Sequence, residues 1–438
     1  MTEQRVPAPV EKPVVLTIAG SDSGGGAGIQ ADLKTIEATG GFGTSAVTAV
    51  TAQNTTGVES SHVLPVEEID TQIDAVLSDF EVRAVKTGML ATAEVVETVT
   101  AAVRGVDAPL VVDPVMVAAT GDRLLTEAAE SAYEALIAGA ALVTPNADEA
   151  AVLTGIEPDD EESARRAGEE IVEMGADAAL IKGGHMPGEA VIDVLVTPET
   201  VETATHPRID TDATHGSGCT LSSAIATRLA RGESMTAAVD RSVGFMERAV
   251  RYHHDVGAGP GAVHHLVEIR NEAARTPTID ALEMALDRLG KADLGPIVPA
   301  AGTNIAAATP YAEGIDETAA VEGGIEETAD GLEPNGPVRF GVPADPARRL
   351  MEARESRPDL RAAIECRIDD EAAAAVDALG WPRIEYGGSD DEAAMNRLGG
   401  TPVDGIAAID RGETVTVLAP TPETLVEGLF ELLGEVDF

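Results

Sequence analysis

From residue 14 onward, short runs of aliphatic and β-branched residues alternate with longer windows of helical periodicity, and this alternation limits the possible folds more than any other feature. A βαβα order predicts an α/β fold with a mostly parallel sheet covered by helices on both faces. The runs at 191–196 and 201–206 are too close together for a crossover helix, so we expect an antiparallel addition at one edge. The strands are predicted at 14–19, 82–88, 110–114, 142–145 and 178–184, and the helices at 28–39, 67–79, 92–104, 124–138 and 163–174.

Two domains are predicted. Glycines and a proline at 257–266 end the last helix of the first region, and a helical window at 278–290 opens another. The predicted boundaries are 12–268 and 278–438, the second domain being a smaller α/β unit. Its acid-rich, glycine-punctuated stretch at 312–337 predicts a long exposed loop.

The charge of the chain excludes some partners. It carries 76 Asp and Glu against 30 Lys and Arg, a formal net charge of −46, which would repel nucleic acids and anionic membrane surfaces. Acids spread along the whole chain, together with only five lysines, are typical of a surface adapted to high salt. We therefore expect a halophilic protein, the alternative being an ordinary protein of unusual acidity.

Two further features bear on the setting. The first 13 residues have no apolar core, and no stretch approaches 18 uncharged apolar residues, so we expect a cytoplasmic protein. Cys219 and Cys366 are too few for a disulfide framework, and we expect reduced thiols. We also expect a homo-oligomer that acts on small molecules.

Two glycine-rich turns follow strand ends, where parallel sheets bind ligands. The first, AGSDSGGGAGIQADLKT, begins at residue 19, and a glycine turn without a ligand is an equal alternative. In the second, Gly216, Ser217 and Gly218 lead into a helix whose first turn holds Cys219. Its amides would stabilise a transferring phosphoryl group, and its dipole is expected to lower the pKa of Cys219, which could then serve as a base. The alternative is a small buried cysteine at a helix start.

Charged side chains follow other predicted strands. Asp113, Asn146 and Glu149 could supply oxygen ligands to Mg²⁺, and Lys182, beside two glycines, could neutralise nucleotide phosphate. The alternatives are that Asp113 or Asn146 caps a turn and that Lys182 is a surface cation.

The order of these motifs resembles one family. AGSDSGGGAGIQADLKT, TAQNTTGV, KTGML, VVDPVM, TPNADEA, KGGH, THGSGCT and GPGAVHH, within residues 14–266, closely resemble the hydroxymethylpyrimidine and phosphomethylpyrimidine kinases of thiamine biosynthesis, in the ribokinase-like superfamily. Most superfamily members have Asp where this chain has Cys219. The resemblance implies ATP and Mg²⁺ as cofactors and two successive phosphorylations. It also implies roles for single residues: Cys219 as the base, Asp32, Gln53, Met89 and Val115 around the pyrimidine, Asp113 and Glu149 at the magnesium, and Lys182, Asp212 and Gly216, Ser217 and Gly218 around the phosphates. A kinase of pyridoxal or another small alcohol is the alternative.

Residues 278–438 resemble the thiamine-phosphate synthase domain often fused behind this kinase in archaea, through GTNIAAATPYA and PVRFGVPADPARRLMEARESRPDLRAAIECR. Active members carry Arg in a Gly-Arg element and His after the RFG element, where this chain has Gly323–Gly324–Ile325 and Ala344–Asp345–Pro346. Arg339 and Arg348 remain as candidate phosphate contacts. Synthase activity and a non-catalytic sensor of thiamine phosphate or a pyrimidine phosphate are therefore equal alternatives.

Overall fold

The structure is a computed structural model that describes residues 8–116, 127–292, 294, 297–328, 331–367, 369–386, 391–401, 405–411 and 414–435. The chain divides into two compact units, Met1–Val267 and Glu268–Phe438. Each unit has its own sheet and its own hydrophobic core. Among the described residues, no helix has both the length and the apolar character that a membrane span requires.

Unit 1 is built on a nine-stranded sheet of order β3-β2-β1-β4-β5-β6-β7-β8-β9. Neighbours pair in parallel along the six strands β2, β1, β4, β5, β6 and β7. At one edge, β3 lies antiparallel to β2. At the other edge β8 and β9 pair antiparallel, as the sequence predicted. The strands are β1 (Val14–Asp22), β2 (Phe42–Asn54), β3 (Gly57–Val63), β4 (Val82–Thr87), β5 (Leu110–Val112), β6 (Leu142–Val143), β7 (Ala179–Ile181), β8 (Ala190–Val196) and β9 (Val201–Pro207).

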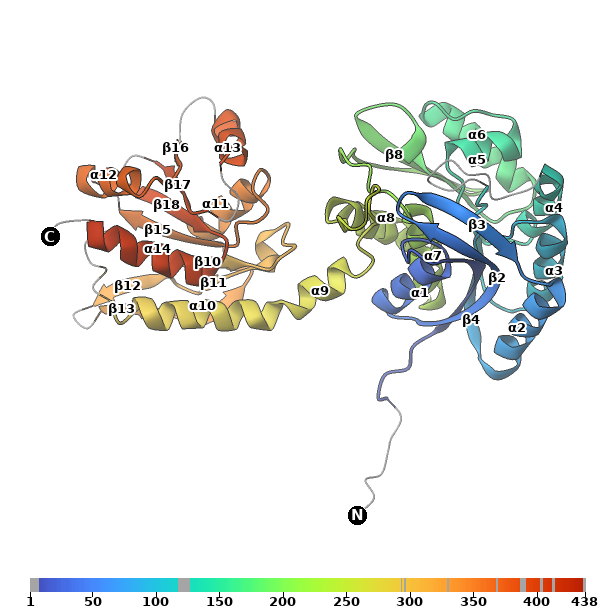
Figure 1. Cartoon of the computed structure of the whole chain (residues 1–438), viewed down its shortest axis with the longest axis horizontal. Coiled ribbons are helices and arrows are strands. Elements are labelled where there is room, and N and C mark those ends of the chain that lie inside the picture. The colour runs from blue at the N-terminus through green and yellow to red at the C-terminus, as the bar shows by residue number, and fades with distance from the viewer. Residues whose placement is uncertain are drawn as a thin grey trace, which may run out of the picture. The chain divides into compact units, whose positions relative to one another are not determined.

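Helices cover both faces of this sheet, as predicted (Figure 1). In β1, Leu16 and Ile18 join the core beneath α2 to α6, whereas Val15 joins the core beneath α1, α7 and α8, because successive side chains of a strand point to opposite faces. The helices are α1 (Gly28–Ala38), α2 (Val66–Asp79), α3 (Ala93–Val103), α4 (Glu127–Ile137), α5 (Ala147–Thr154), α6 (Glu161–Glu173), α7 (Ser217–Ala230) and α8 (Met235–Arg251). Of the helix predicted at 124–138, residues 124–126 lie outside the described part of the chain.

Unit 2 has a seven-stranded sheet of order β14-β11-β10-β15-β18-β17-β16 and a separate hairpin of β12 and β13. Its sheet is antiparallel except for the pair β16 and β17. The strands are β10 (Ile305–Ala308), β11 (Thr318–Val321), β12 (Ile325–Thr328), β13 (Gly331–Pro334), β14 (Val338–Phe340), β15 (Ala362–Arg367), β16 (Arg383–Glu385), β17 (Ala407–Asp410) and β18 (Thr414–Ala419).

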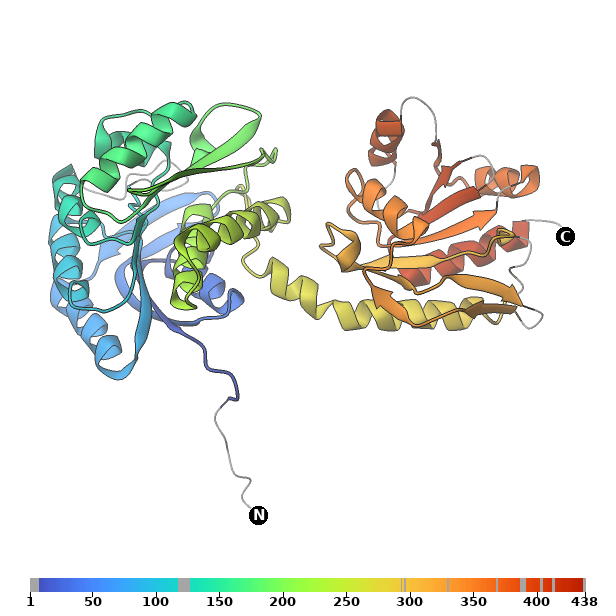
Figure 2. The same cartoon turned by 180° about the vertical axis from the view of Figure 1, so that it is seen from behind.

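The helices of unit 2 also lie on both faces of its sheet (Figure 2). Leucines of α10 and α14 pack on one face, and α11 and α13 cover the other. The helices are α9 (Val267–Ala273), α10 (Arg275–Leu289), α11 (Asp345–Arg354), α12 (Asp370–Ala378), α13 (Asp391–Gly399) and α14 (Pro422–Glu435).

The prediction of a long exposed loop at 312–337 is wrong. Within it, β11 is buried along its whole length and lies between β10 and β14, and β12 and β13 form the hairpin. The prediction failed because β11 is the short run Thr-Ala-Ala-Val, whose two alanines have low strand propensity, and acidic residues flank it. Residues 329–330 of this stretch lie outside the described part.

Candidate active site

A cavity of about 1030 Å³ lies at the carboxyl ends of the parallel strands of unit 1. The five strands β1, β4, β5, β6 and β7 run in one direction, so the residues that follow them meet at one edge of the sheet. The residues proposed from sequence that line the cavity are Gln53, Met89, Asp113, Val115, Asn146, Glu149, Lys182, Gly216, Ser217, Gly218 and Cys219.

The N-terminus of α7 opens into this cavity through Ser217 and Gly218. Its N-cap is Gly216, at φ +83°, and no side chain among the described residues caps the helix. The first amides of a helix have no acceptor within the helix and carry its positive dipole end, so they favour an anion. A Cβ at Gly216 would overlap the carbonyl oxygen of Gly26, and glycine is therefore needed here for close approach as well as for conformation.

The first glycine-rich turn is held by Asp22, which sequence reasoning missed. The Asp22 carboxylate accepts the N–H groups of Gly24 at 2.7 Å, Gly26 at 2.9 Å and Ala27 at 2.8 Å. His215, one residue before the N-cap of α7, lies 3.2 Å from the same carboxylate. Burial opposes ionisation of Asp22, but the hydrogen bonds from His215 and these amides lower its pKa overall. The signal in the sequence was an Asp two residues before a glycine run, which is typical of a side chain that accepts from its own turn.

Two carboxylates and one ammonium group meet near the ends of β5, β6 and β7. Lys182 Nζ lies 3.0 Å from Asp113 Oδ1 and 3.8 Å from Glu149 Oε2. Burial raises the pKa of Glu149 to about 7, because the attraction of Lys182 offsets only part of the desolvation and Asp113 adds repulsion. Asn146 is the N-cap of α5: its side-chain oxygen accepts the N–H of Glu149, as the capping alternative predicted. Lys182 is mostly buried in this ion pair and is not a surface cation.

Cys219 stands in the first turn of α7 and is half-buried at the cavity wall. Burial raises the pKa of its thiol to about 12. The attraction of Lys86 and a hydrogen bond from the Gly28 amide oppose this shift without cancelling it. The expectation of a lowered pKa is therefore wrong, because desolvation outweighs the groups that favour the thiolate.

The other end of the cavity has apolar walls. Met89 and Val115 line it, and the methyl group of Met89 lies against Gly20 in the first turn. Gln53 lines it from the end of β2, with its Nε2 3.4 Å from His215 Nε2. A slot with one amide side chain suits a small heteroaromatic ring.

Two of the proposed residues do not line this cavity. Asp32 is fully buried on α1, where it accepts hydrogen bonds from Thr17, Lys86 and Ser223, so the prediction that it contacts the pyrimidine is wrong. Asp212 is exposed and outside the lining; its backbone oxygen accepts the N–H of Thr214 in the turn before α7. The structure does not bring Asp212 into the lining, although Thr211 and Thr214 line the cavity, and its phosphate contact stays a prediction.

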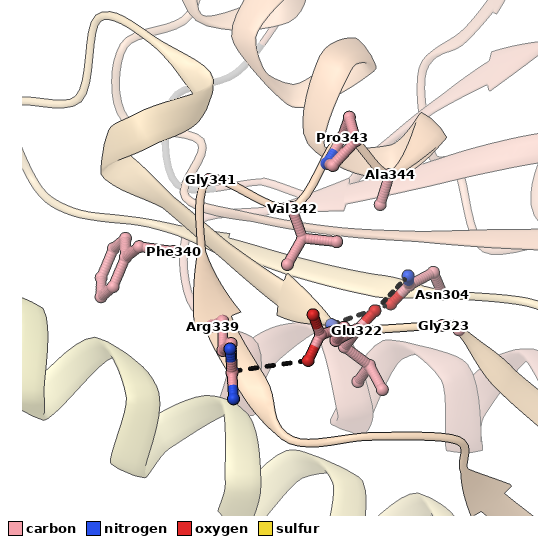
Figure 3. Close-up of a pocket in the computed structure, with 11 residues that line it drawn as sticks. Asn304, Glu322, Gly323, Arg339, Phe340, Gly341, Val342, Pro343 and Ala344 are labelled. Atoms are coloured by element: carbon pink, nitrogen blue, oxygen red, sulfur yellow. Dashed lines mark hydrogen bonds and ion pairs between the residues drawn. The ribbon is translucent and has the colours of Figure 1, made fainter.

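Unit 2 has an open pocket of about 530 Å³ at the ends of β10, β11 and β14 (Figure 3). Arg339 lines it and lies 3.4 Å from Glu322 Oε2, which takes up part of its charge. Gly323, Gly324 and Ala344, the positions where the synthase pattern has Arg and His, line the same pocket. Arg348 lies outside this lining: it pairs with Asp345 and donates to the backbone oxygen of Pro343, which lines the pocket.

Comparison with protein families gives two matches. The model described as phosphomethylpyrimidine kinase matches residues 22–264, and the model described as thiamine-phosphate synthase ThiN matches residues 281–435. The two matches fall in unit 1 and unit 2.

Curated relatives match the first unit. The chain is 50% identical over 258 residues to a hydroxymethylpyrimidine/phosphomethylpyrimidine kinase of Streptomyces coelicolor, which covers 59% of this chain and 96% of the relative. It is 45% identical over 262 residues to the thiamine biosynthesis bifunctional protein ThiED of Geobacter sulfurreducens, covering 59% of this chain and 54% of that protein.

Solved structures show the same fold. A phosphomethylpyrimidine kinase from Clostridium difficile is 42% identical with a TM-score of 0.50, covering 55% of this chain and all of that one. A pyridoxal kinase from Staphylococcus aureus in complex with AMP-PCP and pyridoxal is 31% identical with a TM-score of 0.56, covering 60% of this chain and 96% of that one. Unit 1 therefore has the ribokinase-like fold.

Proposed function

Because the chain belongs to the phosphomethylpyrimidine kinase family, we propose that its first unit transfers phosphoryl groups from ATP to hydroxymethylpyrimidine and then to the resulting monophosphate. In the first step the substrate hydroxyl oxygen bonds to the γ-phosphorus, the bond to ADP breaks, and the hydroxyl proton leaves. In the second step an oxygen of the monophosphate is the nucleophile. The single observation that carries the proposal is one cavity with an uncapped helix N-terminus, Lys182 and a slot beside Gln53.

Binding of ATP is supported by charge placement. The amides at the start of α7 and the Lys182 ammonium are the groups suited to the β- and γ-phosphates, where negative charge develops during transfer. Asp113 and Glu149 hold Lys182 in the cavity, so its charge is fixed in place before the nucleotide binds. Such fixed alignment contributes much of the catalysis of phosphoryl transfer.

Magnesium is the metal that these residues fit. Within the described ranges, no three His, Cys, Asp or Glu side chains gather as a protein cage for a metal. Asp113 and Glu149 offer one carboxylate each, and Mg²⁺ commonly takes one or two carboxylates together with phosphate oxygens and water. The ion would supply charge neutralisation on the phosphates. Asp113 and Glu149 are the residues that would hold it.

Cys219 is the proposed base for the first step alone. The hydroxyl of hydroxymethylpyrimidine must lose a proton, whereas the phosphate oxygen that attacks in the second step is already ionised near neutral pH. Replacing Cys219 with Ala should therefore slow the first phosphorylation by about 10² or more while changing the second much less. Equal loss of both steps would show that Cys219 acts by packing.

Sequence identity favours hydroxymethylpyrimidine over pyridoxal as the substrate, since the pyrimidine kinases match at 38% to 50% and the pyridoxal kinase at 31%. The pyridoxal kinase nevertheless shares the fold, so pyridoxal is the second candidate. A coupled ATPase assay in molar KCl compares both substrates directly. Gln53→Leu should raise KM for the pyrimidine by at least about tenfold, because a buried polar contact is lost. A higher kcat/KM for pyridoxal in the wild-type protein would overturn the assignment.

The second unit is a thiamine-phosphate synthase domain by its family match, and its proposed reaction joins the pyrimidine pyrophosphate to thiazole phosphate with release of pyrophosphate. A specific observation favours the second candidate, a non-catalytic sensor: the pocket offers Arg339, paired with Glu322, where a leaving pyrophosphate needs cations. The full chain given both substrates separates the two. Thiamine phosphate formation supports the synthase, and saturable binding without turnover supports the sensor.

Salt adaptation is proposed from the net charge of −46. At low ionic strength these charges repel one another and destabilise the compact state, and salt screens the repulsion. The melting temperature should therefore rise steadily as KCl increases from millimolar to molar. A melting temperature that does not change with KCl would remove this proposal.

A further inference from the structure

Lys86 is a fully buried charged side chain that the proposed mechanism does not use. It stands on β4, on the sheet face that α1 and α7 cover, and its exposed fraction is 0%. Its Nζ lies 2.8 Å and 3.0 Å from the two carboxylate oxygens of Asp32, which is equally buried. A lysine at this depth keeps its charge only with a partner, and Asp32 provides one.

Asp32 is itself fixed from two further elements. Thr17 Oγ1 on β1 donates to Asp32 Oδ2 at 2.6 Å, and Ser223 Oγ on α7 donates to Asp32 Oδ1 at 2.8 Å. The carboxylate thus accepts from β1, β4 and α7 while it belongs to α1. Buried ion pairs of this kind are rarely needed for stability, because apolar residues of similar volume fill the space as well. Fold stability is therefore a weak explanation for the pair.

The pair is linked to the helix that carries the proposed base. Ser223, which bonds Asp32, follows Cys219 by four residues on α7, so the two side chains share one face of the helix one turn apart. The charged groups that act on Cys219 are Lys86 of β4, Asp32 of α1, Asp113 after β5 and Lys182 after β7. After desolvation, the attraction of Lys86 is the largest influence on the thiol, ahead of the repulsion of Asp32 and of Asp113.

We infer that Lys86 is a positioning residue for the first phosphorylation, whose ammonium group, fixed by Asp32, favours the thiolate of Cys219. The inference rests on the proposed function for the role of the thiolate as base. The thiolate accepts the hydroxyl proton as the new O–P bond forms and the bond to ADP breaks, and the thiol later returns this proton to water. Lys86 lies outside the cavity lining, so it has no direct contact with a molecule bound there, and the inference is that it acts through Cys219.

Alkylation of Cys219 by iodoacetamide tests this without any substrate, because the rate follows the thiolate fraction. The full chain carries Cys366→Ala, which removes the other thiol. Lys86→Met should slow alkylation at fixed pH by roughly tenfold or more, through loss of the positive charge. Ser223→Ala, which removes a hydrogen bond to Asp32 but no charge, is the matched control and should stay within about twofold of the parent.

The double variant Lys86→Met/Asp32→Asn separates charge from packing, because it leaves no unpaired buried charge. If Lys86 has only a structural role, the double variant should regain the parental rate of alkylation, and that result would overturn the inference. We expect the rate to stay several-fold below the parent, and the kcat of the first phosphorylation to fall with it while KM for ATP is unchanged. Asp32→Asn alone removes the partner that keeps Lys86 charged, so it should also slow alkylation; alkylation faster than in the parent would count against the inference.

These outcomes are independent of the kinase assignment. If neither hydroxymethylpyrimidine nor pyridoxal is phosphorylated but the order of alkylation rates holds, the proposed function fails and the effect of Lys86 on Cys219 stands. If both steps proceed normally in a folded Lys86→Met protein, the kinase stands and the inference fails.

Discussion

Gly216 offers the sharpest test of how the second glycine-rich turn, at Gly216, Ser217 and Gly218, is built. Its φ is +83°, and a Cβ there would come closer than 3.0 Å to the carbonyl oxygen of Gly26 in the first glycine-rich turn. Gly232, just after α7, has φ +82°, but a Cβ there would meet nothing within 4 Å. The two glycines therefore share one backbone conformation and differ in available space.

Alanine at either position must adopt a left-handed conformation, which costs about 1–2 kcal/mol. Gly232→Ala should lose only that amount, with no change in kinase activity. Gly216→Ala should lose the same amount of stability. Its Cβ must also push the start of α7 away from the first glycine-rich turn at Gly26. A displacement of about 1 Å at a reacting group lowers rates by about 10², so we expect kcat/KM to fall by at least that factor.

Urea unfolding measures the loss of stability in each variant, and the coupled ATPase assay measures kcat/KM. The expected pattern is a shared loss of stability in both variants, with a further loss of stability and a collapse of activity in Gly216→Ala alone. If Gly216→Ala kept kcat/KM within about twofold of the wild type, the close packing of the two turns would have no part in alignment.

Three other predictions concern single side chains. With the metal removed by EDTA, the wild type should lose stability as pH rises from about 4.5 to about 7. The cause is the raised pKa of Glu149, because the folded state holds a proton that the unfolded chain releases in this range. Glu149→Gln should lack this loss when urea unfolding is measured at pH 5 and at pH 8. Lys182→Met should weaken ADP binding by about tenfold or more in a calorimetric titration, whereas Lys12→Met, which removes an exposed lysine paired with Glu37, should leave binding unchanged. Arg339→Ala should weaken binding of thiamine phosphate to the full chain by about tenfold, and Arg348→Ala, outside the pocket, should not; equal effects of the two changes would mean that the pocket is not the binding site.

The parallel sheet could be predicted because its signals are local. Five of the six parallel strands are short aliphatic runs followed by a turn residue, and strands of one direction bring their ends together. The sixth, β2, has 13 residues that include Thr, Ser and Gly, and it was not among the predicted strands. For this reason the sequence predicts that Asp113, Asn146 and Lys182, which are far apart in the chain, lie at one edge of the sheet, and all three line the cavity there. Nothing in the sequence separated Asp113 as a ligand from Asn146 as a cap, because both roles use an oxygen just beyond a strand.

Asp32 shows why the rest could not be predicted. It stands within a motif whose glycines lie at the cavity, so proximity in sequence placed it there too. However, α1 has already begun at Gly28, and the helix turns Asp32 toward the sheet, where Lys86 lies 54 residues away in the chain. A buried partner at that separation leaves no local signal. Conversely, Asp22 has a local signal in the glycine run that follows it, and it was missed because its partners are backbone amides, which a sequence does not distinguish from one another.

The lysines divide into two groups by exposure, one on the acidic surface and one in the interior of the first unit. Of five lysines, Lys86 is fully buried and Lys182 is 14% exposed by side chain, whereas Lys12 is 45% and Lys291 is 72% exposed. Salt screens exposed charges within about 3 Å at 1 M, but it reaches buried pairs much less. The exposed acidic residues and the mostly buried Lys182 should therefore respond differently to KCl. Stability should change strongly with salt, while the effect of Lys182 on nucleotide affinity should persist at molar KCl, because that charge is held by Asp113 out of reach of the solvent ions.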